Sequence, residues 1–415
     1  MIYAILVASG FLLVSAMTAV RPGRSGIFRV VAFPVGWAAS ELAVQAVVIQ
    51  CGLVFLQWWW GWPNTLWFTI ALIAVGSFVI VLNVVLVIAM FQSRTTVRRA
   101  MLNDDRSPLD IGAAGDDQFG SWWRTLSQVP LHPRSMQLVS NVPYGPHARH
   151  RLDIWRQSTT PSDAPIIFFV HGGSWIFGDK REQGRPMLHE FVARGWIAVT
   201  VNYRLAPKYP WPAQIEDVTR AFGWVKSSIR PMGGDPTRIV VAGASAGGQL
   251  ASLLSLASHD DTWRPRDTNS NDDWSVRGCI SLYGVLEMTG DDDVWNGKGR
   301  GLRHLLERYV VVKNVDKHRE LFESISPLAR ITNDAPAFLV IHGSNDTLVD
   351  RSVARHFVDR FRLIAREPVY YVELPLTQHA FDVIASPRTS STTRAAVAFA
   401  AHAARLTSPP ESVRG

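Results

Sequence analysis

The sequence predicts an α/β fold with a mostly parallel, eight-stranded sheet flanked by helices, preceded by an N-terminal module of transmembrane helices. Residues 1–91 are rich in apolar side chains and poor in charge. From residue 136 onward, strand-like apolar runs alternate with helix-like ones. The central runs "IIFFV", "RIVVA" and "AFLVI" are continuous rather than alternating, as strands are when helices cover both faces of a parallel sheet.

The predicted membrane module, residues 1–91, contains three apolar stretches. They are residues 2–20, residues 30–60 (most continuous over 43–57) and residues 66–91. A helix needs about 20 mostly apolar residues to cross a bilayer, which the first and third stretches provide. Glu41, Gln45 and Gln50 interrupt the second stretch. Because a carboxylate at the bilayer centre costs about 3 kcal/mol, whether this stretch spans stays open.

Two other interpretations of this region are a cleaved signal peptide and a buried core. The first stretch has no basic residue before it and is followed by further apolar stretches, which disfavours a signal peptide. Residues 66–91 carry no charge and are longer than an ordinary core helix, which disfavours a buried core. We therefore expect about three transmembrane helices in the cell membrane.

Basic residues beside the apolar stretches predict the orientation of the module. Three arginines lie between the first and second stretches and three follow the third: Arg21, Arg24, Arg29, Arg94, Arg98 and Arg99. With three spans both groups lie on one side, which the positive-inside rule assigns to the cytoplasm. The uncharged, tryptophan-rich residues 58–67 suit an aromatic belt on the other side. We expect the chain after residue 91 to be cytoplasmic, provided that the second stretch spans.

The overall charge and the cysteines limit the classes of function. The formal net charge is +7, but no long Lys/Arg run or nucleic-acid-binding motif accompanies it, so we expect no nucleic-acid partner. Attraction to an anionic membrane surface accounts for the basic balance. Cys51 and Cys279 lie in separate apolar runs, which disfavours a disulfide framework. The motifs for metal sites and dinucleotide cofactors are missing from the sequence, so we expect neither.

The composition changes twice after the apolar region. Residues 92–135 predict a linker with one short amphipathic helix near Trp122 and Trp123, residues 136–405 an α/β domain, and residues 406–415 a disordered tail. The predicted strands are residues 137–142, 151–155, 166–170, 197–202, 239–242, 279–283, 337–342 and 369–373. The clearest predicted helices are residues 213–228, 248–258, 352–365 and 391–404.

A serine follows the predicted strand 239–242, where the chain turns into a helix. Residues 243–247, "GASAG", fit the G-x-S-x-G pattern, which by itself also arises by chance in a chain of this length. Between a buried strand and a helix, flanking glycines allow the two elements to approach closely, and the turn exposes the serine Oγ. This context predicts that Ser245 is a nucleophile rather than a small residue in a tight turn.

A glycine turn follows the predicted strand 166–170. In "HGGSWIFGDK" the backbone N–H groups of Gly172 and Gly173 can point into the crevice at the carboxyl ends of the strands. With the N–H group of Ala246 they would form an oxyanion hole. The alternative is an ordinary glycine-rich turn, which the serine turn beside it disfavours. We expect His171 to orient this turn.

The chain also supplies an acid and a base in the order Ser, Asp, His. Asp346 follows the predicted strand 337–342 and is the favoured acid. Asp350 competes with Asp346 for the role of the acid, but Asp350 lies just before a predicted helix, where an aspartate is typical of an N-cap. His379 lies in the loop after the last predicted strand and is the favoured base. The histidines that compete with it, none of which occupies that loop, are His171, His189 and His342.

The motifs "HGGSW", "NYRLAP", "GASAGG", "HGSND" and "QHAF" resemble those of the α/β-hydrolase carboxylesterases of the hormone-sensitive-lipase and acetyl-esterase group. The "HGGSWIFGDK" form is also similar to bacterial esterases and prenylcysteine methylesterase-like proteins. The resemblance spans about residues 136–405 and implies an α/β-hydrolase fold. It implies Ser245 as nucleophile, Asp346 as acid, His379 as base, Gly172, Gly173 and Ala246 as the oxyanion hole, and structural roles for Tyr203 and Arg204.

The N-terminal module departs from the usual soluble members of that group, so their lid and pocket do not transfer. Residues 287–325 are a candidate for a small cap. These features predict a membrane-anchored serine carboxylesterase or lipase-like hydrolase that forms an acyl-enzyme on a carboxylic ester, and the anchor suggests a lipid-like substrate. Acyl transfer and hydrolysis of amides or formamides would use the same residues and stay open. A catalytically inactive membrane scaffold is a further alternative, which the complete residue set disfavours.

Overall fold

The computed structural model describes residues 2–22, 27–60, 66–103, 106–111, 136–159, 162–257, 261–264 and 273–405. The helix predicted near Trp122 and Trp123 and the predicted tail, residues 406–415, lie outside the described residues.

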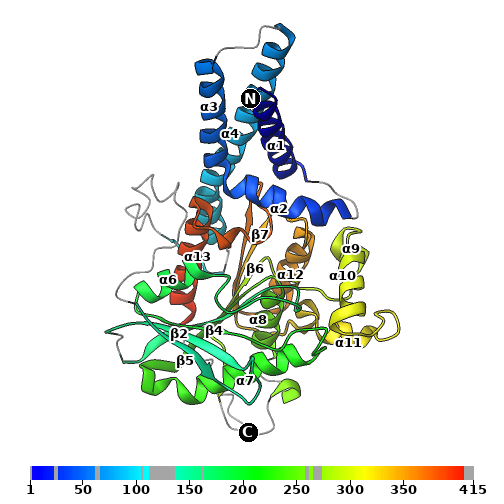
Figure 1. Ribbon diagram of the computed structural model, residues 1–415. Coiled ribbons are helices and arrows are strands. Elements are labelled where there is room, and N and C mark those ends of the chain that lie inside the picture. Colours follow the sequence, from blue (N-terminus) through cyan, green and yellow to red (C-terminus); the bar gives the residue numbers. More distant parts are fainter. Residues whose placement is uncertain are drawn as a thin grey trace, which may run out of the picture.

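An eight-stranded sheet forms the centre of the α/β domain (Figure 1). The strands are β1 Met136–Pro143, β2 Arg151–Gln157, β3 Ala164–Val170, β4 Ile197–Val201, β5 Gly234–Ala244, β6 Gly278–Leu282, β7 Ala337–Gly343 and β8 Val369–Leu374. Their order is β1-β2-β4-β3-β5-β6-β7-β8; β2 pairs antiparallel with β1 and β4, and the other neighbours are parallel. All eight predicted strands are present, and the carboxyl ends of the parallel strands share one edge.

Helices cover both faces of the sheet, which explains the continuous apolar runs. One face packs against α7 Ala213–Ser228, α8 Ala246–Leu256 and α12 Arg351–Ile364, and the other against α6 Arg185–Ala193, α13 Pro387–Ala403 and the end of α4. The four clearest predicted helices correspond to α7, α8, α12 and α13. Short helical turns are η2 Arg230–Met232, η3 Asp261–Trp263, η5 Pro327–Arg330 and η6 Phe381–Val383.

The segment after β6 folds into short helices on one side of the domain (Figure 1). They are α9 Asp292–Trp295, α10 Arg300–Leu305, the π-helical turn η4 Leu306–Val310 and α11 Arg319–Ser324. Trp295, Leu306 and Phe322 are buried in the same core as α7, α8 and α12. Residues 287–325, the predicted small cap, are therefore anchored in the core of the domain.

The N-terminal region forms four helices within the described residues: α1 Ile2–Val20, α2 Ile27–Glu41, α3 Ala43–Trp60 and α4 Leu66–Leu102. The second apolar stretch of the sequence is thus divided in two. The helix is interrupted at Leu42, and α2 lies along the α/β domain, whereas α1, α3 and α4 extend away from it (Figure 1). Glu41, which interrupts the apolar pattern, ends the helix that lies on the domain rather than one that extends away from it.

α4 continues beyond residue 91, where the sequence suggested that a linker begins. Its last three turns enter the α/β domain, where Val97 and Met101 are completely buried among residues of α13 and the sheet. The four-residue spacing of these two side chains places them on one face of the helix. A single helix therefore connects the apolar region to the core of the domain.

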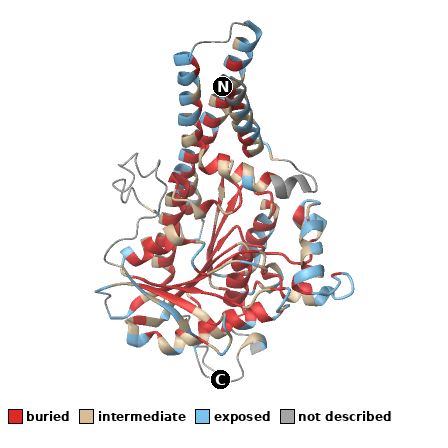
Figure 2. Ribbon diagram, viewed as in Figure 1, coloured by how far each residue is buried: buried red, intermediate tan, exposed pale blue. Residues whose placement is uncertain are grey.

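The outer surfaces of the apolar helices are exposed and apolar. Two of the described helices, Ala43–Trp60 and Leu66–Leu102, are long and apolar enough to cross a membrane, and only 17% and 28% of their most apolar windows are buried. Figure 2 shows exposed residues along α1, α3 and α4, in contrast to the buried sheet. Phe11, Phe55 and Trp59 are among the exposed side chains. Helices of this composition are weak evidence for membrane association, because signal sequences and core helices share it.

Candidate active site

The turn between β5 and α8 holds Ser245 in a strained backbone conformation. Its φ is 55° and its ψ −120°, in a region that residues with a side chain rarely adopt. A Cβ on Gly243 would lie 2.1 Å from the Gly247 carbonyl oxygen, and one on Gly247 would lie 2.2 Å from the Val170 carbonyl oxygen. Glycine is therefore required on both sides of Ser245 because backbone fills the space that a side chain would need.

The structure brings Ser245, His379 and Asp346 together at the carboxyl edge of the sheet. His379 Nε2 lies 2.8 Å from Ser245 Oγ, and His379 Nδ1 lies 2.6 Å from Asp346 Oδ2. The three residues follow β5, β8 and β7, whose carboxyl ends meet at this edge. Asp346 and His379 are buried, and Ser245 is partly exposed.

Asp346 is held as a carboxylate by several donors. Its Oδ1 accepts hydrogen bonds from the backbone N–H groups of Leu348 and Val349, both at 2.9 Å. Burial would raise the pKa of Asp346, but the charge and hydrogen bond of His379, together with those of His342, hold that pKa well below its ordinary value. An ionised carboxylate at this place fixes the Nδ1–H tautomer of His379 and leaves Nε2 able to accept a proton.

Of the residues that compete for the acid and base roles, Asp350 and His189 make other contacts, whereas His342 contacts Asp346. Asp350 caps α12, accepting a hydrogen bond from Ser352 N at 3.0 Å, and forms an ion pair with Lys298. His342 Nε2 lies 3.3 Å from Asp346 Oδ2. His189 packs on Trp155 from α6, far along the chain from the serine turn.

His171 orients the glycine turn through contacts on both sides of its ring. The ring stacks on Tyr203 with centroids 4.4 Å apart, and Nδ1 lies 2.6 Å from the Gly172 carbonyl oxygen. The Tyr203 hydroxyl donates to the His171 carbonyl oxygen at 3.0 Å. Burial lowers the pKa of His171 to about 4, so the imidazole is neutral. Arg204 pairs with Asp217, as a structural residue would.

The glycine turn packs directly against the serine turn. A Cβ on Gly172 would lie 2.6 Å from the Ala244 carbonyl oxygen, and Gly173 has a φ of 115°. The Gly172 N–H group donates to Gln183 Oε1 at 2.7 Å and is thus already engaged. The part of the chain that the structure describes gives no acceptor to the N–H groups of Gly173 and Ala246.

Two neighbours of His379 were missed from the sequence. Gln378 Oε1 accepts from Thr347 N at 3.2 Å and from His379 N at 3.3 Å, and so connects the two loops that carry the acid and the base. The Tyr283 ring lies 4.4 Å from the His379 ring, and its hydroxyl donates to Asp382. The "QHAFD" motif contains Gln378 and Asp382, but a single sequence gives no signal for the Tyr283 contact.

The α/β domain matches a known family. The BD-FAE family model matches residues 152–361, about half of the chain. The chain belongs to the BD-FAE family. Esterase LipC of Mycobacterium tuberculosis is 37% identical over 294 residues, 69% of this chain and 72% of LipC. The probable carboxylic ester hydrolase LipM of the same organism is 40% identical over 264 residues, 63% of this chain and 60% of LipM, so this chain matches less than two thirds of LipM.

These relatives are named as an esterase and a probable carboxylic ester hydrolase. Solved structures show the same fold. Esterase B from Lactobacillus rhamnosis covers 76% of this chain and 97% of its own, with a TM-score of 0.56 at 17% identity. Esterase 2 from Thermogutta terrifontis aligns over 68% of this chain and 99% of the esterase, with a TM-score of 0.53 at 19% identity. Their likeness supports the α/β-hydrolase fold with its mostly parallel sheet.

Proposed function

We propose that this BD-FAE family member is a membrane-anchored serine carboxylesterase with Ser245 as nucleophile, His379 as base and Asp346 as acid. The observation that carries the proposal is the hydrogen-bonded series from Ser245 Oγ through the His379 ring to Asp346 on a strained turn. The esterase names of its relatives support the reaction class.

In this mechanism His379 Nε2 takes the Ser245 proton as Oγ attacks the ester carbonyl carbon. The negative charge that develops on the carbonyl oxygen is stabilised by the N–H groups of Gly173 and Ala246, each worth about 3 kcal/mol. Asp346 stabilises the imidazolium. His379 then protonates the leaving alcohol as the ester C–O bond breaks, leaving the acyl group on Ser245.

Water completes the reaction with the same base. His379 Nε2 accepts a proton from water as its oxygen attacks the acyl-enzyme, and Ser245 regains a proton when the carboxylic acid leaves. The Gly172 N–H group would join the oxyanion hole only by leaving Gln183, so in this proposal Gly172 shapes the hole by its close approach to Ala244.

The apolar helices anchor the enzyme in the cell membrane. The exposed apolar surfaces of α3 and α4 support this step, as do the arginines that follow the membrane-length part of α4. By the positive-inside rule the hydrolase domain is cytoplasmic. Protease added to the outside of sealed inverted vesicles should cleave the hydrolase domain. A hydrolase domain that is protected in inverted vesicles and cleaved in right-side-out vesicles would refute the orientation.

A panel of p-nitrophenyl esters from acetate to palmitate tests the activity. We expect p-nitrophenol release that Ser245→Ala abolishes, with the longer chains favoured if the ester is lipid-like. Acyl transfer and amide or formamide hydrolysis would use the same residues, and product analysis with competing alcohols and amides separates them. Failure of the folded protein to cleave any ester, amide or acyl donor would leave only the inactive scaffold.

A further inference from the structure

Helix α2 contacts the loop that carries His379, and the end of α1 contacts the loop that carries Asp346. Trp37 Nε1 donates a hydrogen bond to the carbonyl oxygen of Ala380, the residue after His379, at 2.9 Å. Asn345, the residue before Asp346, donates through Nδ2 to the carbonyl oxygens of Ala19 at 2.7 Å and Val20 at 3.1 Å. The N-terminal helices thus bind the immediate neighbours of both the acid and the base.

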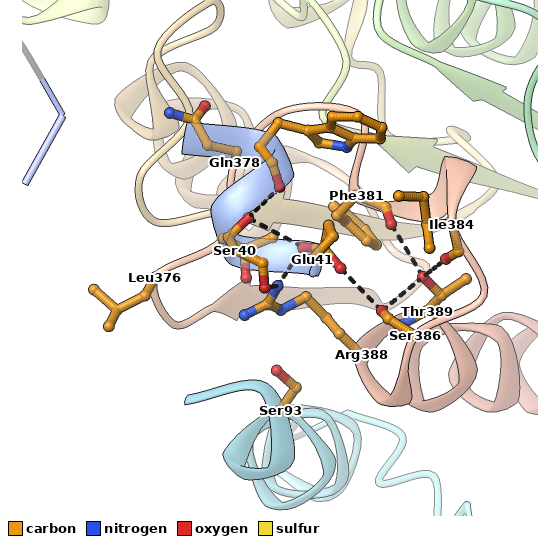
Figure 3. Close-up of polar contacts among 12 residues, drawn as sticks. Ser40, Glu41, Ser93, Leu376, Gln378, Phe381, Ile384, Ser386, Arg388 and Thr389 are labelled. Atoms are coloured by element: carbon orange, nitrogen blue, oxygen red, sulfur yellow. Dashed lines mark hydrogen bonds and ion pairs between the residues drawn. The ribbon is translucent and has the colours of Figure 1, made fainter. Parts of the chain in front are cut away.

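A buried ion pair joins the end of α2 to the start of α13. Glu41 and Arg388 form this pair, and both side chains are completely buried. Ser386, the N-cap of α13, donates from Oγ to the second carboxylate oxygen of Glu41 at 2.9 Å (Figure 3). A cation in the first turn of a helix is opposed by the helix dipole, so the Glu41 carboxylate offsets both the charge of Arg388 and the dipole.

The pair would be costly to break. Removing one partner of a buried ion pair leaves an uncompensated charge and costs about 3–5 kcal/mol. If α2 left the domain, Arg388 would lose the carboxylate that balances it. The first turn of α13 and the loop from His379 to Ser386 therefore hold α2 in one position.

Two further contacts bring α2 to the side chains of the site. The Phe33 ring lies edge-on to the His379 ring with centroids 6.0 Å apart. A Cβ on Gly36 would lie 3.2 Å from Gln378 Nε2. The Oε1 atom of the same Gln378 amide accepts hydrogen bonds from Thr347 N and His379 N. The surface of α2 therefore packs on the side chain that connects the loop of Asp346 with the loop of His379.

We infer that α2 is part of the active site, and that Glu41 and Trp37 are positioning residues that hold the His379 loop in register with Ser245. The inference rests on the proposed roles of Ser245 and His379. It gives the N-terminal module a second task, because the same chain segment that leads to the membrane helices forms one side of the site. Phe33 places an apolar ring beside the His379 ring.

Trp37→Phe tests the positioning role with little change of shape. It keeps the apolar ring and removes the donor to Ala380, so we expect kcat on p-nitrophenyl butyrate to fall about two- to tenfold, the range for one hydrogen bond, with KM within about twofold. The matched control is Trp59→Phe on the exposed surface of α3, which should keep wild-type kcat. Equal kcat for Trp37→Phe and wild type would overturn the inference.

The ion pair is tested with a double variant that avoids an unpaired charge. Glu41→Gln with Arg388→Met removes both charges, and we expect the melting temperature to stay within a few degrees while kcat falls at least about tenfold through displacement of the His379 loop. The control removes the ion pair between Lys226, in the last turn of α7, and Asp273 by Lys226→Met with Asp273→Asn, and should keep kcat.

The rate of Ser245 labelling by a fluorophosphonate separates the two proposals. The inference is supported if the wild-type protein is labelled and the folded Glu41/Arg388 double variant is labelled more slowly. Wild-type rates in this double variant and in Trp37→Phe would refute the role of α2 and leave the esterase proposal intact. If the wild type itself is not labelled, the proposed function fails and the inference fails with it. A double variant that does not fold would leave Trp37→Phe as the deciding measurement.

Discussion

His342 Nε2 lies 3.3 Å from Asp346 Oδ2, the same carboxylate oxygen that His379 Nδ1 contacts at 2.6 Å. His342 is completely buried at the end of β7, and its Nε2 also lies 3.0 Å from the Val349 carbonyl oxygen. Two imidazoles therefore face one carboxylate. The arrangement fixes the direction in which Asp346 presents its oxygen to His379.

Replacement of His342 should weaken catalysis without abolishing it. His342→Phe keeps a ring of similar shape but removes the polar contact with Asp346, and we expect kcat to fall about two- to tenfold. Steady-state kinetics on p-nitrophenyl butyrate measure the effect, with the exposed His356→Phe as control. Wild-type kcat in a folded His342→Phe variant would show that Asp346 needs no such support.

The two aspartates that follow β7 should differ sharply in their effect on activity. Asp346→Asn removes the carboxylate that sets the His379 tautomer, so kcat should fall by about 10⁴. Asp350→Asn keeps an N-cap for α12, loses only the pairing with Lys298, and should retain most of the activity. Comparable losses in both variants, at equal melting temperatures, would contradict the choice of Asp346.

His171 should make the folded enzyme sensitive to mild acid. Its pKa is 6.5 in an ordinary setting and about 4 when buried, so between these values the unfolded chain binds a proton that the folded chain does not. The free energy of unfolding should therefore decrease by roughly 3 kcal/mol as the pH falls from 6.5 to 4. Denaturant unfolding of the wild type and of His171→Phe measures this contribution.

His171→Phe should show a smaller loss of stability over the same pH range, since phenylalanine binds no proton. Replacement of the exposed His356 by glutamine should leave the pH dependence as it is in the wild type. An identical pH dependence in the wild type and in His171→Phe would show that the buried imidazole takes up its proton without cost.

The strands and the serine turn were predictable because each depends on local sequence. "IIFFV", "IVVA" and "AFLVI" are apolar along their whole length, and these parts of β3, β5 and β7 are buried on both faces. Gly243 and Gly247 mark the turn because backbone atoms occupy the positions of their missing side chains. Asp346 and His379 could be chosen by their positions after successive strands.

The arrangement of the N-terminal helices was not predictable in the same way. Glu41 appeared as a polar interruption of an apolar stretch, since its partner Arg388 lies 347 residues away in the sequence. Likewise, the end of the apolar region at residue 91 suggested the start of a linker, but the helix continues because Val97 and Met101 find apolar partners in the core of the α/β domain. Both features depend on tertiary contacts that one sequence does not display.

In the proposed mechanism Ser245 is a nucleophile activated by His379. Incubation of the purified full-length protein with a fluorophosphonate, followed by mass spectrometry of its peptides, tests this most directly. We predict a covalent adduct on Ser245 in the wild type, none in Ser245→Ala, and strongly slowed labelling in His379→Ala. A wild-type protein that is folded yet remains unlabelled, or one labelled at another serine, would contradict the account.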